Sequence, residues 1–172
     1  MLRSYRIRLA RRRDIHRLPA IERDASRRFL IAGYLELHSE QTLPLEVLEH
    51  RQSIGRLWVA LDARDRPVGF AAASIVDGYA HIDELDVSLD HGRKGIGSRL
   101  VKAVCRWARR QRLHGVTLST QREVPWNAPF YQRLGFAILA ETELSEGLLQ
   151  VRVHETAAGL PVDERVIMLR AL

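Results

Sequence analysis

A glycine-rich turn constrains the fold of this chain more than any other feature. In the segment LDHGRKGIGSRL, residues 89–100, the six residues 92–97 contain three glycines and two cations and lead into an apolar-periodic stretch. That stretch, residues 96–113, carries Leu100 and Val104 at helical spacing with arginines opposite, which predicts an amphipathic helix. Residues 78–89 alternate apolar and polar side chains, as a half-buried strand does. A strand, a glycine turn and a helix in this order predict an α/β fold.

Short strand and helix patterns follow one another along the rest of the chain, and the sequence contains neither a linker nor an internal repeat. We therefore expect one domain over residues 1–172 with a mixed, mostly antiparallel sheet. Residues 146–160 fit a strand at their start and a helix later. Asp14 is a candidate cap for the first helix, and Pro19 predicts a break or kink near its start. Further strands are expected at 5–10, 56–62, 67–77, 115–120, 136–141 and 165–172, with 56–62 and 67–77 as a hairpin, and further helices at 15–29, 43–55 and 127–135.

The glycine turn predicts an anion site. The first N–H groups of a helix have no backbone partners, the helix dipole adds positive charge there, and glycines let the backbone approach an anion closely. The spacing Gly92-x-x-Gly95-x-Gly97 differs from both the Rossmann and the Walker orders. The alternative is an ordinary glycine turn with a solvated Arg93–Lys94 pair.

Cysteine content and charge limit the other classes. Cys105 is the only cysteine, so an intrachain disulfide is impossible, and we expect no metal. No apolar run reaches membrane-spanning length, no secretory leader pattern is present, and we expect a cytoplasmic protein. The net charge of +6 suits an anionic ligand or a nucleic acid. Because residues 106–112 are explained as the solvated face of a helix, we do not expect nucleic-acid binding.

Two segments resemble a known family. ELDVSLDHGRKGIGSRLV looks like the acyl-coenzyme A site of the GNAT superfamily of N-acyltransferases, whose turn reads Q/R-x-x-G-x-G/A. NAPFYQRLGF, residues 127–136, is similar to the later motif of that family. Gly92 departs from the pattern because Gln or Arg is usual there, which removes one side-chain contact to the pyrophosphate. The segments VPWNAPFY and RVIML resemble a large bacterial subgroup whose substrates are mostly unassigned.

The resemblance implies a fold, a reaction and a coenzyme site. The fold is a central sheet that splays apart where acetyl-CoA binds. The reaction moves an acetyl group from acetyl-CoA to a primary amine, on a small molecule or a protein, by direct attack in a ternary complex. A non-catalytic acyl-CoA-binding regulatory module and a tRNA-directed acetyltransferase are the alternatives, and homodimers are common in the family. The implied coenzyme-binding residues are Leu85, Asp86, Val87, Gly92, Arg93, Lys94, Gly95, Ile96, Gly97, Ser98, Asn127 and Tyr131.

The resemblance also implies catalytic roles. Tyr131 matches the general acid that protonates the departing thiolate, and its alternative role is core packing. The amide of Val87 would donate to the thioester oxygen. Asn127 matches an asparagine near the pantetheine arm, although it is equally suited to cap a helix.

The general base is the least determined residue. The candidates are Asp83, Glu84 and His81, in that order, all on the strand that ends at Val87. Regular alternation puts Glu84 on the opposite face from Asp83 and His81, unless a bulge intervenes. The alternative is an acidic rim that only attracts a cationic amine. Glu22 and Asp24, on the first helix, could also line the acceptor site.

Overall fold

The computed structural model describes residues 5–172, which divide into two compact units. The N-terminal unit lies within residues 1–73 and 83–103, and the C-terminal unit comprises residues 74–82 and 104–172. Strands β3 (Pro67–Val76) and β4 (Tyr79–Val87) and helix α3 (Ile96–Arg110) contribute residues to both.

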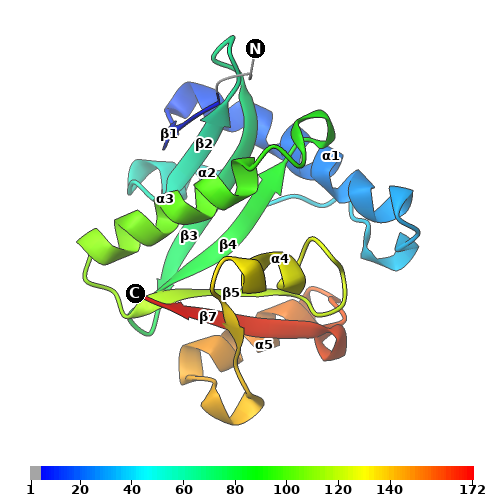
Figure 1. Ribbon diagram of the computed structural model, residues 1–172, viewed down its shortest axis with the longest axis vertical. Helices are drawn as coiled ribbons and strands as arrows, with labels where there is room; N and C mark the ends of the chain where they lie inside the picture. The colour runs from blue at the N-terminus through cyan, green and yellow to red at the C-terminus, as the bar shows by residue number, and fades with distance from the viewer. Residues whose placement is uncertain (1–4) are drawn as a thin grey trace. The chain divides into compact units, whose positions relative to one another are not determined.

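The sheet contains β3 and β4 together with β1 (Arg6–Leu9), β2 (Leu57–Leu61), β5 (Gly115–Gln121), β6 (Ala137–Ile138) and β7 (Arg165–Ala171). Its strand order is β1-β2-β3-β4-β5-β7-β6. Strands β4 and β5 run parallel, whereas the pairs β1–β2, β2–β3, β5–β7 and β6–β7 are antiparallel. The predicted α/β class with a mixed, mostly antiparallel sheet is therefore confirmed, and so is the hairpin of β2 and β3. Figure 1 shows the ribbon with these labels.

The N-terminal unit differs from the prediction at its first helix. Residues Arg12–Arg17 form a 3-10 turn, and the α-helix begins only at Leu18, so Pro19 lies in its first turn, where the missing N–H costs no hydrogen bond. The carboxylate of Asp14 accepts the N–H of Arg11 instead of capping this α-helix. The other elements of this unit are β1 (Arg6–Leu9), α1 (Leu18–Ile31), η2 (Leu35–Leu37), α2 (Leu45–Ser53), β2 (Leu57–Leu61) and η3 (Leu89–His91).

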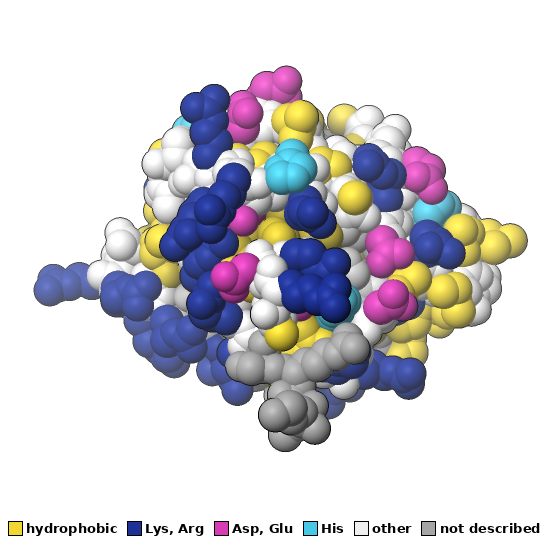
Figure 2. Space-filling view, turned by 90° about the horizontal axis from the view of Figure 1, so that it is seen from above, with side chains coloured by type: hydrophobic (Ala, Val, Ile, Leu, Met, Phe, Trp, Pro, Cys, Tyr) yellow, Lys and Arg dark blue, Asp and Glu magenta, His cyan; other side chains and the backbone are white. Residues whose placement is uncertain are grey.

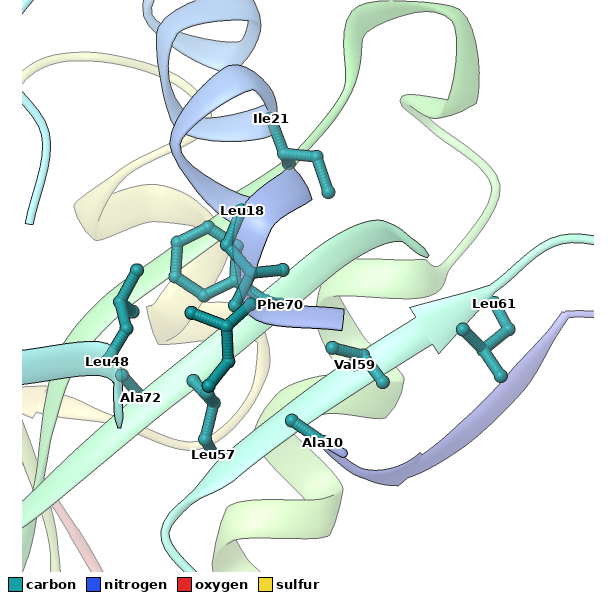
Figure 3. Packing of buried hydrophobic residues seen from close by; sticks show 10 residues of the cluster. Ala10, Leu18, Ile21, Leu48, Leu57, Val59, Leu61, Phe70 and Ala72 are labelled. Carbon is teal, nitrogen blue, oxygen red and sulfur yellow. The ribbon is translucent and has the colours of Figure 1, made fainter. Parts of the chain in front are cut away.

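Helices α1 and α2 pack on one face of β2 and β3. Figure 3 shows Leu18 and Leu48 close to Phe70 and Leu57, and all four side chains are almost completely buried. Burying each such side chain contributes about 1.5–3 kcal/mol. Gly69, next to Phe70, points to the other face, where a Cβ built on it would lie 3.5 Å from Cγ2 of Ile96. The start of α3 therefore lies on the face of the sheet opposite to α1 and α2.

The C-terminal unit is built around the β5–β7 pair, whose register runs from Gly115↔Ala171 to Gln121↔Arg165. Most of the ambiguous segment 146–160 is helical: Glu146–Ala157 form a helix capped by Ser145, whose Oγ accepts the N–H of Leu148. No helix among residues 5–172 is long and apolar enough to cross a membrane. The elements are β5 (Gly115–Gln121), α4 (Ala128–Arg133), β6 (Ala137–Ile138), η4 (Glu141–Glu143), α5 (Glu146–Ala157), η5 (Val162–Glu164) and β7 (Arg165–Ala171).

Candidate active site

The turn between η3 and α3 has an unusual backbone. Arg93 has φ 55° and Gly95 has φ 75°, both in the left-handed region. Glycine adopts this region freely, whereas an arginine pays about 1–2 kcal/mol for it. Left-handed residues inside a turn direct consecutive N–H groups to one side and create a concavity for an anion. The backbone of the turn therefore suits an anionic ligand.

Helix α3 adds donors to this concavity. The N–H of Arg99 donates to the carbonyl of Gly95 at 3.2 Å, so the N–H groups of residues 96–98 precede the first bond of this kind. The ammonium of Lys94 donates to the carbonyl of Asp90 at 2.5 Å and so fastens the turn while keeping its charge there. The start of α3 and Lys94 thus give the turn N–H donors and positive charge, which an anion site requires.

Three carboxylates meet in the N-terminal unit. Each of Glu22 on α1 and Glu84 and Asp86 on β4 has an oxygen within 4.8 Å of the others. Oδ2 of Asp86 is buried and has no hydrogen-bond partner among residues 5–172. We call these three residues the carboxylate cluster. The alternation along β4 correctly predicts that Glu84 and Asp86 share a side.

Burial and mutual repulsion make the carboxylate cluster retain protons. Burial and, to a smaller extent, the charge of Glu84 raise the pKa of Glu22 from 4.5 to about 7. The carboxylate of Glu22 also accepts the N–H of Leu43 at 3.0 Å, and this hydrogen bond opposes the rise. Burial also raises the pKa of Asp86 well above its usual range, and the charges of Glu84 and Glu22 add to this rise. The cluster can therefore take up or release a proton near neutral pH.

The other two base candidates have different surroundings. Oδ2 of Asp83 accepts a hydrogen bond from Nε of Arg51 at 2.8 Å, and both side chains are less than one-fifth exposed. His81 is buried in the C-terminal unit, and its Nδ1 lies 2.9 Å from Oγ1 of Thr117 on the neighbouring strand. The sequence could not predict that Arg51 binds Asp83, because the two residues are 32 positions apart.

Asp24 lies next to the turn. Its Oδ2 accepts the N–H of Leu89, the first residue of η3, at 2.9 Å. This contact joins α1 to the segment that leads into the glycine turn. The structure thus gives Asp24 a role in positioning the turn, in addition to the expectation that it lines the acceptor site.

The end of β4 leads directly into η3. The N–H of Ser88 donates to the carbonyl of Val68 on β3 at 2.9 Å. A Cβ built on Gly69 would lie 2.9 Å from the carbonyl of Asp86 and 3.2 Å from Cγ2 of Val87, so the missing side chain lets β3 and β4 approach closely there. Residues 83–87 and the turn 92–98 therefore belong to the N-terminal unit together with the carboxylate cluster.

Asn127 and Tyr131 belong to the C-terminal unit. Tyr131 is buried, and its ring contacts those of Phe130 and Phe136 edge-on, at centroid distances of 5.0 and 5.6 Å. Asn127 stands at the N-cap position of α4 without capping it through its side chain. Its Nδ2 donates to Oγ1 of Thr120 at 2.6 Å, and its buried Oδ1 has no hydrogen-bond partner within the described part of the chain.

The surface charge is predominantly basic. Figure 2 shows one face on which Lys and Arg side chains cover more of the surface than Asp and Glu side chains do. This agrees with the net charge of +6 and favours an anionic ligand.

Comparisons with known proteins assign the family. Residues 18–136, more than half of the chain, match the Acetyltransferase (GNAT) family. The uncharacterized N-acetyltransferase YjcF of Bacillus subtilis (strain 168) is 28% identical over 105 residues, which are 60% of this chain and 72% of the relative.

Solved structures share the fold. An acetyltransferase of the GNAT family from Staphylococcus aureus Mu50 matches with a TM-score of 0.73 at 19% identity, over 98% of this chain and 99% of that one. The PaiA N-acetyltransferase of Thermoplasma acidophilum, crystallised in complex with coenzyme A, matches with a TM-score of 0.67 at 17% identity, over 98% and 99% of the two chains. Since the family match includes the glycine turn and the carboxylate cluster, the chain belongs to the acetyltransferase (GNAT) family and is an acyltransferase.

Proposed function

We propose that this protein is an N-acetyltransferase that moves the acetyl group of acetyl-CoA to a primary amine. The observation that carries the amine half is the carboxylate cluster of Glu22, Glu84 and Asp86. An ammonium group is attracted by such a cluster, and the cluster can take up a proton near neutral pH because the pKa of Glu22 is about 7. The Thermoplasma acidophilum relative with bound coenzyme A supports the coenzyme half.

The glycine turn is the proposed pyrophosphate site. Its left-handed residues, the N–H groups at the start of α3 and the charges of Arg93 and Lys94 all favour an anion. The backbone of residues 85–87 would pair with the pantetheine arm as an added strand does. The unpartnered Oδ1 of Asn127 suits an amide N–H of the kind that this arm carries.

The acetyl transfer requires three proton transfers and one exchange of bonds. Glu84 accepts the proton that the ammonium must lose before its nitrogen attacks the thioester carbon. The amide of Val87 donates to the carbonyl oxygen as charge develops there. The C–N bond forms and the C–S bond breaks, and the sulfur takes a proton from the hydroxyl of Tyr131. The nitrogen loses its second proton to solvent, and the phenolate of Tyr131 regains a proton from solvent.

The surroundings favour Glu84 as the base. The guanidinium of Arg51 neutralises Asp83 and holds its carboxylate in place. His81 is buried and bound to Thr117. Glu84 instead lies close to the carboxylates of Glu22 and Asp86. A proton taken from the substrate ammonium would reduce the repulsion among these three groups.

The test is an acetyl-transfer assay with thiol-release detection on a panel of amines. Glu84→Gln should lower kcat/KM at pH 7 by about 10²–10⁴-fold, and the loss should shrink towards pH 10, where the free amine needs no base. Asp83→Asn is the matched control and should retain activity to within about tenfold. The base assignment fails if Asp83→Asn shows the pH-dependent loss instead. The proposed reaction fails if no amine releases thiol with the native protein.

A further inference from the structure

Gly92 leaves room for a side chain from another part of the N-terminal unit. A Cβ built on Gly92 would lie 2.6 Å from Nη2 and 3.9 Å from Cζ of Arg28 on α1. Gly92 has φ −63°, which any residue adopts, so the backbone does not require glycine here. The guanidinium of Arg28 therefore occupies the place into which a side chain at position 92 would extend.

Helix α1 is fixed in a position that brings Arg28 to the turn. Asp24 accepts the N–H of Leu89, and Arg28 follows Asp24 by four residues, on the same face of the helix. One face of α1 thus carries both the anchor to η3 and the cation beside Gly92. Helix α1 is long enough, at 14 residues, to hold this face rigid.

Burial and a neighbouring arginine both act against the charge of Arg28, and Asp86 supports it. Burial lowers the pKa of Arg28, and the neighbouring charge of Arg93 lowers it further, whereas Asp86 opposes the change. Both guanidinium groups nevertheless stay protonated, because an arginine does not lose its proton in proteins. Arg28 is partly buried and Arg93 is exposed, and an anion that accepts hydrogen bonds from both would stabilise these two like charges.

We propose that Arg28 binds the pyrophosphate of the coenzyme and supplies from α1 the side-chain contact that Gly92 cannot make. This inference rests on the proposed function. The guanidinium offers paired N–H donors to phosphate oxygens, in a geometry that lysine cannot reproduce. Gly92 is then required by the position of Arg28, because a side chain at position 92 would displace the guanidinium.

The experiment is a calorimetric titration with coenzyme A, dephospho-coenzyme A and pantetheine. Arg28→Gln should weaken binding of the first two by the same factor, about 10- to 100-fold, and leave pantetheine, which has no pyrophosphate, unchanged. Arg27→Gln is the matched control, because Arg27 belongs to the same helix with its side chain 61% exposed, and it should change each Kd by less than about twofold.

The outcomes separate the two proposals. Native protein that does not bind coenzyme A would overturn the proposed function and this inference together. Native binding with an unchanged Kd in Arg28→Gln would overturn only the role of Arg28. A loss confined to coenzyme A would assign Arg28 to the 3′-phosphate, and an equal loss for pantetheine would show a general disturbance of the site; either result overturns the pyrophosphate assignment.

A second variant tests the shared space independently of the charge change. Gly92→Ala fits the φ of −63°, with its Cβ 3.2 Å from the carbonyl oxygen of Leu89, and it should displace the guanidinium and weaken coenzyme A binding by about tenfold. In the Arg28→Gln background the same substitution should add less than about threefold, because the displaced group is already gone. Additive losses would overturn the inference. Thermal unfolding of each apo variant shows whether it is folded, and Arg28→Lys, with a partial loss of affinity, replaces Arg28→Gln if that variant is not.

Discussion

The protonation of Glu22 should make the stability of this protein depend on pH in a direction opposite to that of an ordinary ion-paired carboxylate. Burial and the charge of Glu84 raise its pKa from 4.5 to about 7. The native state therefore binds more protons than the unfolded state between these two values. Stability is highest below pH 4.5, falls as the pH rises through this window, and stays at the lower level above pH 7.

The size of this effect follows from the pKa change. At about 1.4 kcal/mol per pKa unit, full ionisation of Glu22 costs about 3 kcal/mol, of which about 2–3 kcal/mol is lost between pH 5 and pH 8. Glu22→Gln keeps an oxygen that can accept the N–H of Leu43, and it carries no charge at either pH. This variant should therefore gain about 2–3 kcal/mol over the native protein as the pH changes from 5 to 8.

The assay is urea unfolding of both proteins at pH 5 and pH 8, with Glu36→Gln, an exchange at an exposed position, as the control. Histidines titrate in the same range, but they are common to all three proteins and cancel in the comparison. The reasoning is refuted if the difference between Glu22→Gln and the native protein is the same at both pH values. It is equally refuted if Glu36→Gln shows the same pH-dependent gain.

Three further predictions concern the turn, the acid and the carboxylate cluster. Gly95→Ala should destabilise the protein by about 1 kcal/mol in urea unfolding, because Gly95 has φ 75° although space for a methyl group is open. Tyr131→Phe should lower kcat about 10²-fold or more with little change in thermal stability, since its ring contacts are kept; an unchanged kcat would leave Tyr131 as a core residue. EDTA and millimolar Ca²⁺ should leave both the unfolding temperature and the reaction rate unchanged, because protons and the substrate ammonium neutralise the carboxylate cluster. A shift of the unfolding temperature with Ca²⁺ would instead assign the cluster to a metal ion.

Local pattern was sufficient for most of the fold. The alternation in residues 78–89 and the periodicity in 96–113 predict β4 and α3 within a few residues. Residues 146–160 could not be assigned, because short apolar runs fit both periods. Tertiary packing decides there: Leu148 of α5 joins Leu144 and Ile167 in one core cluster.

The site could be predicted only where its residues are close in the sequence. Glu84 and Asp86 share a side because β-strands alternate, and the turn is a local motif. The rotation of α1 about its axis relative to β4 is not encoded locally, so the sequence left open whether Glu22 reaches this strand. For the same reason Gly92 suggested only a lost contact: the residue that fills its space precedes it by 64 positions.

Helix α1 links the two halves of the proposed site. Glu22 and Arg28 lie six residues apart, about 9 Å along the helix, and Asp86 is subject to both: Arg28 lowers its pKa, whereas Glu22 and Glu84 raise it. An anion bound beside Arg28 and Arg93 would cancel part of the stabilising positive charge and raise the pKa of Asp86 further. Coenzyme binding should therefore be accompanied by proton uptake, and its affinity should fall as the pH rises.

Calorimetry in buffers of different ionisation enthalpy measures this uptake directly. In the pH range where Asp86 titrates, native protein should take up a fraction of a proton per coenzyme, and Asp86→Asn, which removes the group that gains the proton, should take up less. Equal uptake in the two proteins would show that the protons bind elsewhere and would separate the anion site from the carboxylate cluster. A smaller uptake in Asp86→Asn would mean that bound coenzyme sets the protonation state of the carboxylate cluster to which the amine binds. The charges that transmit this effect lie on α1 and β4.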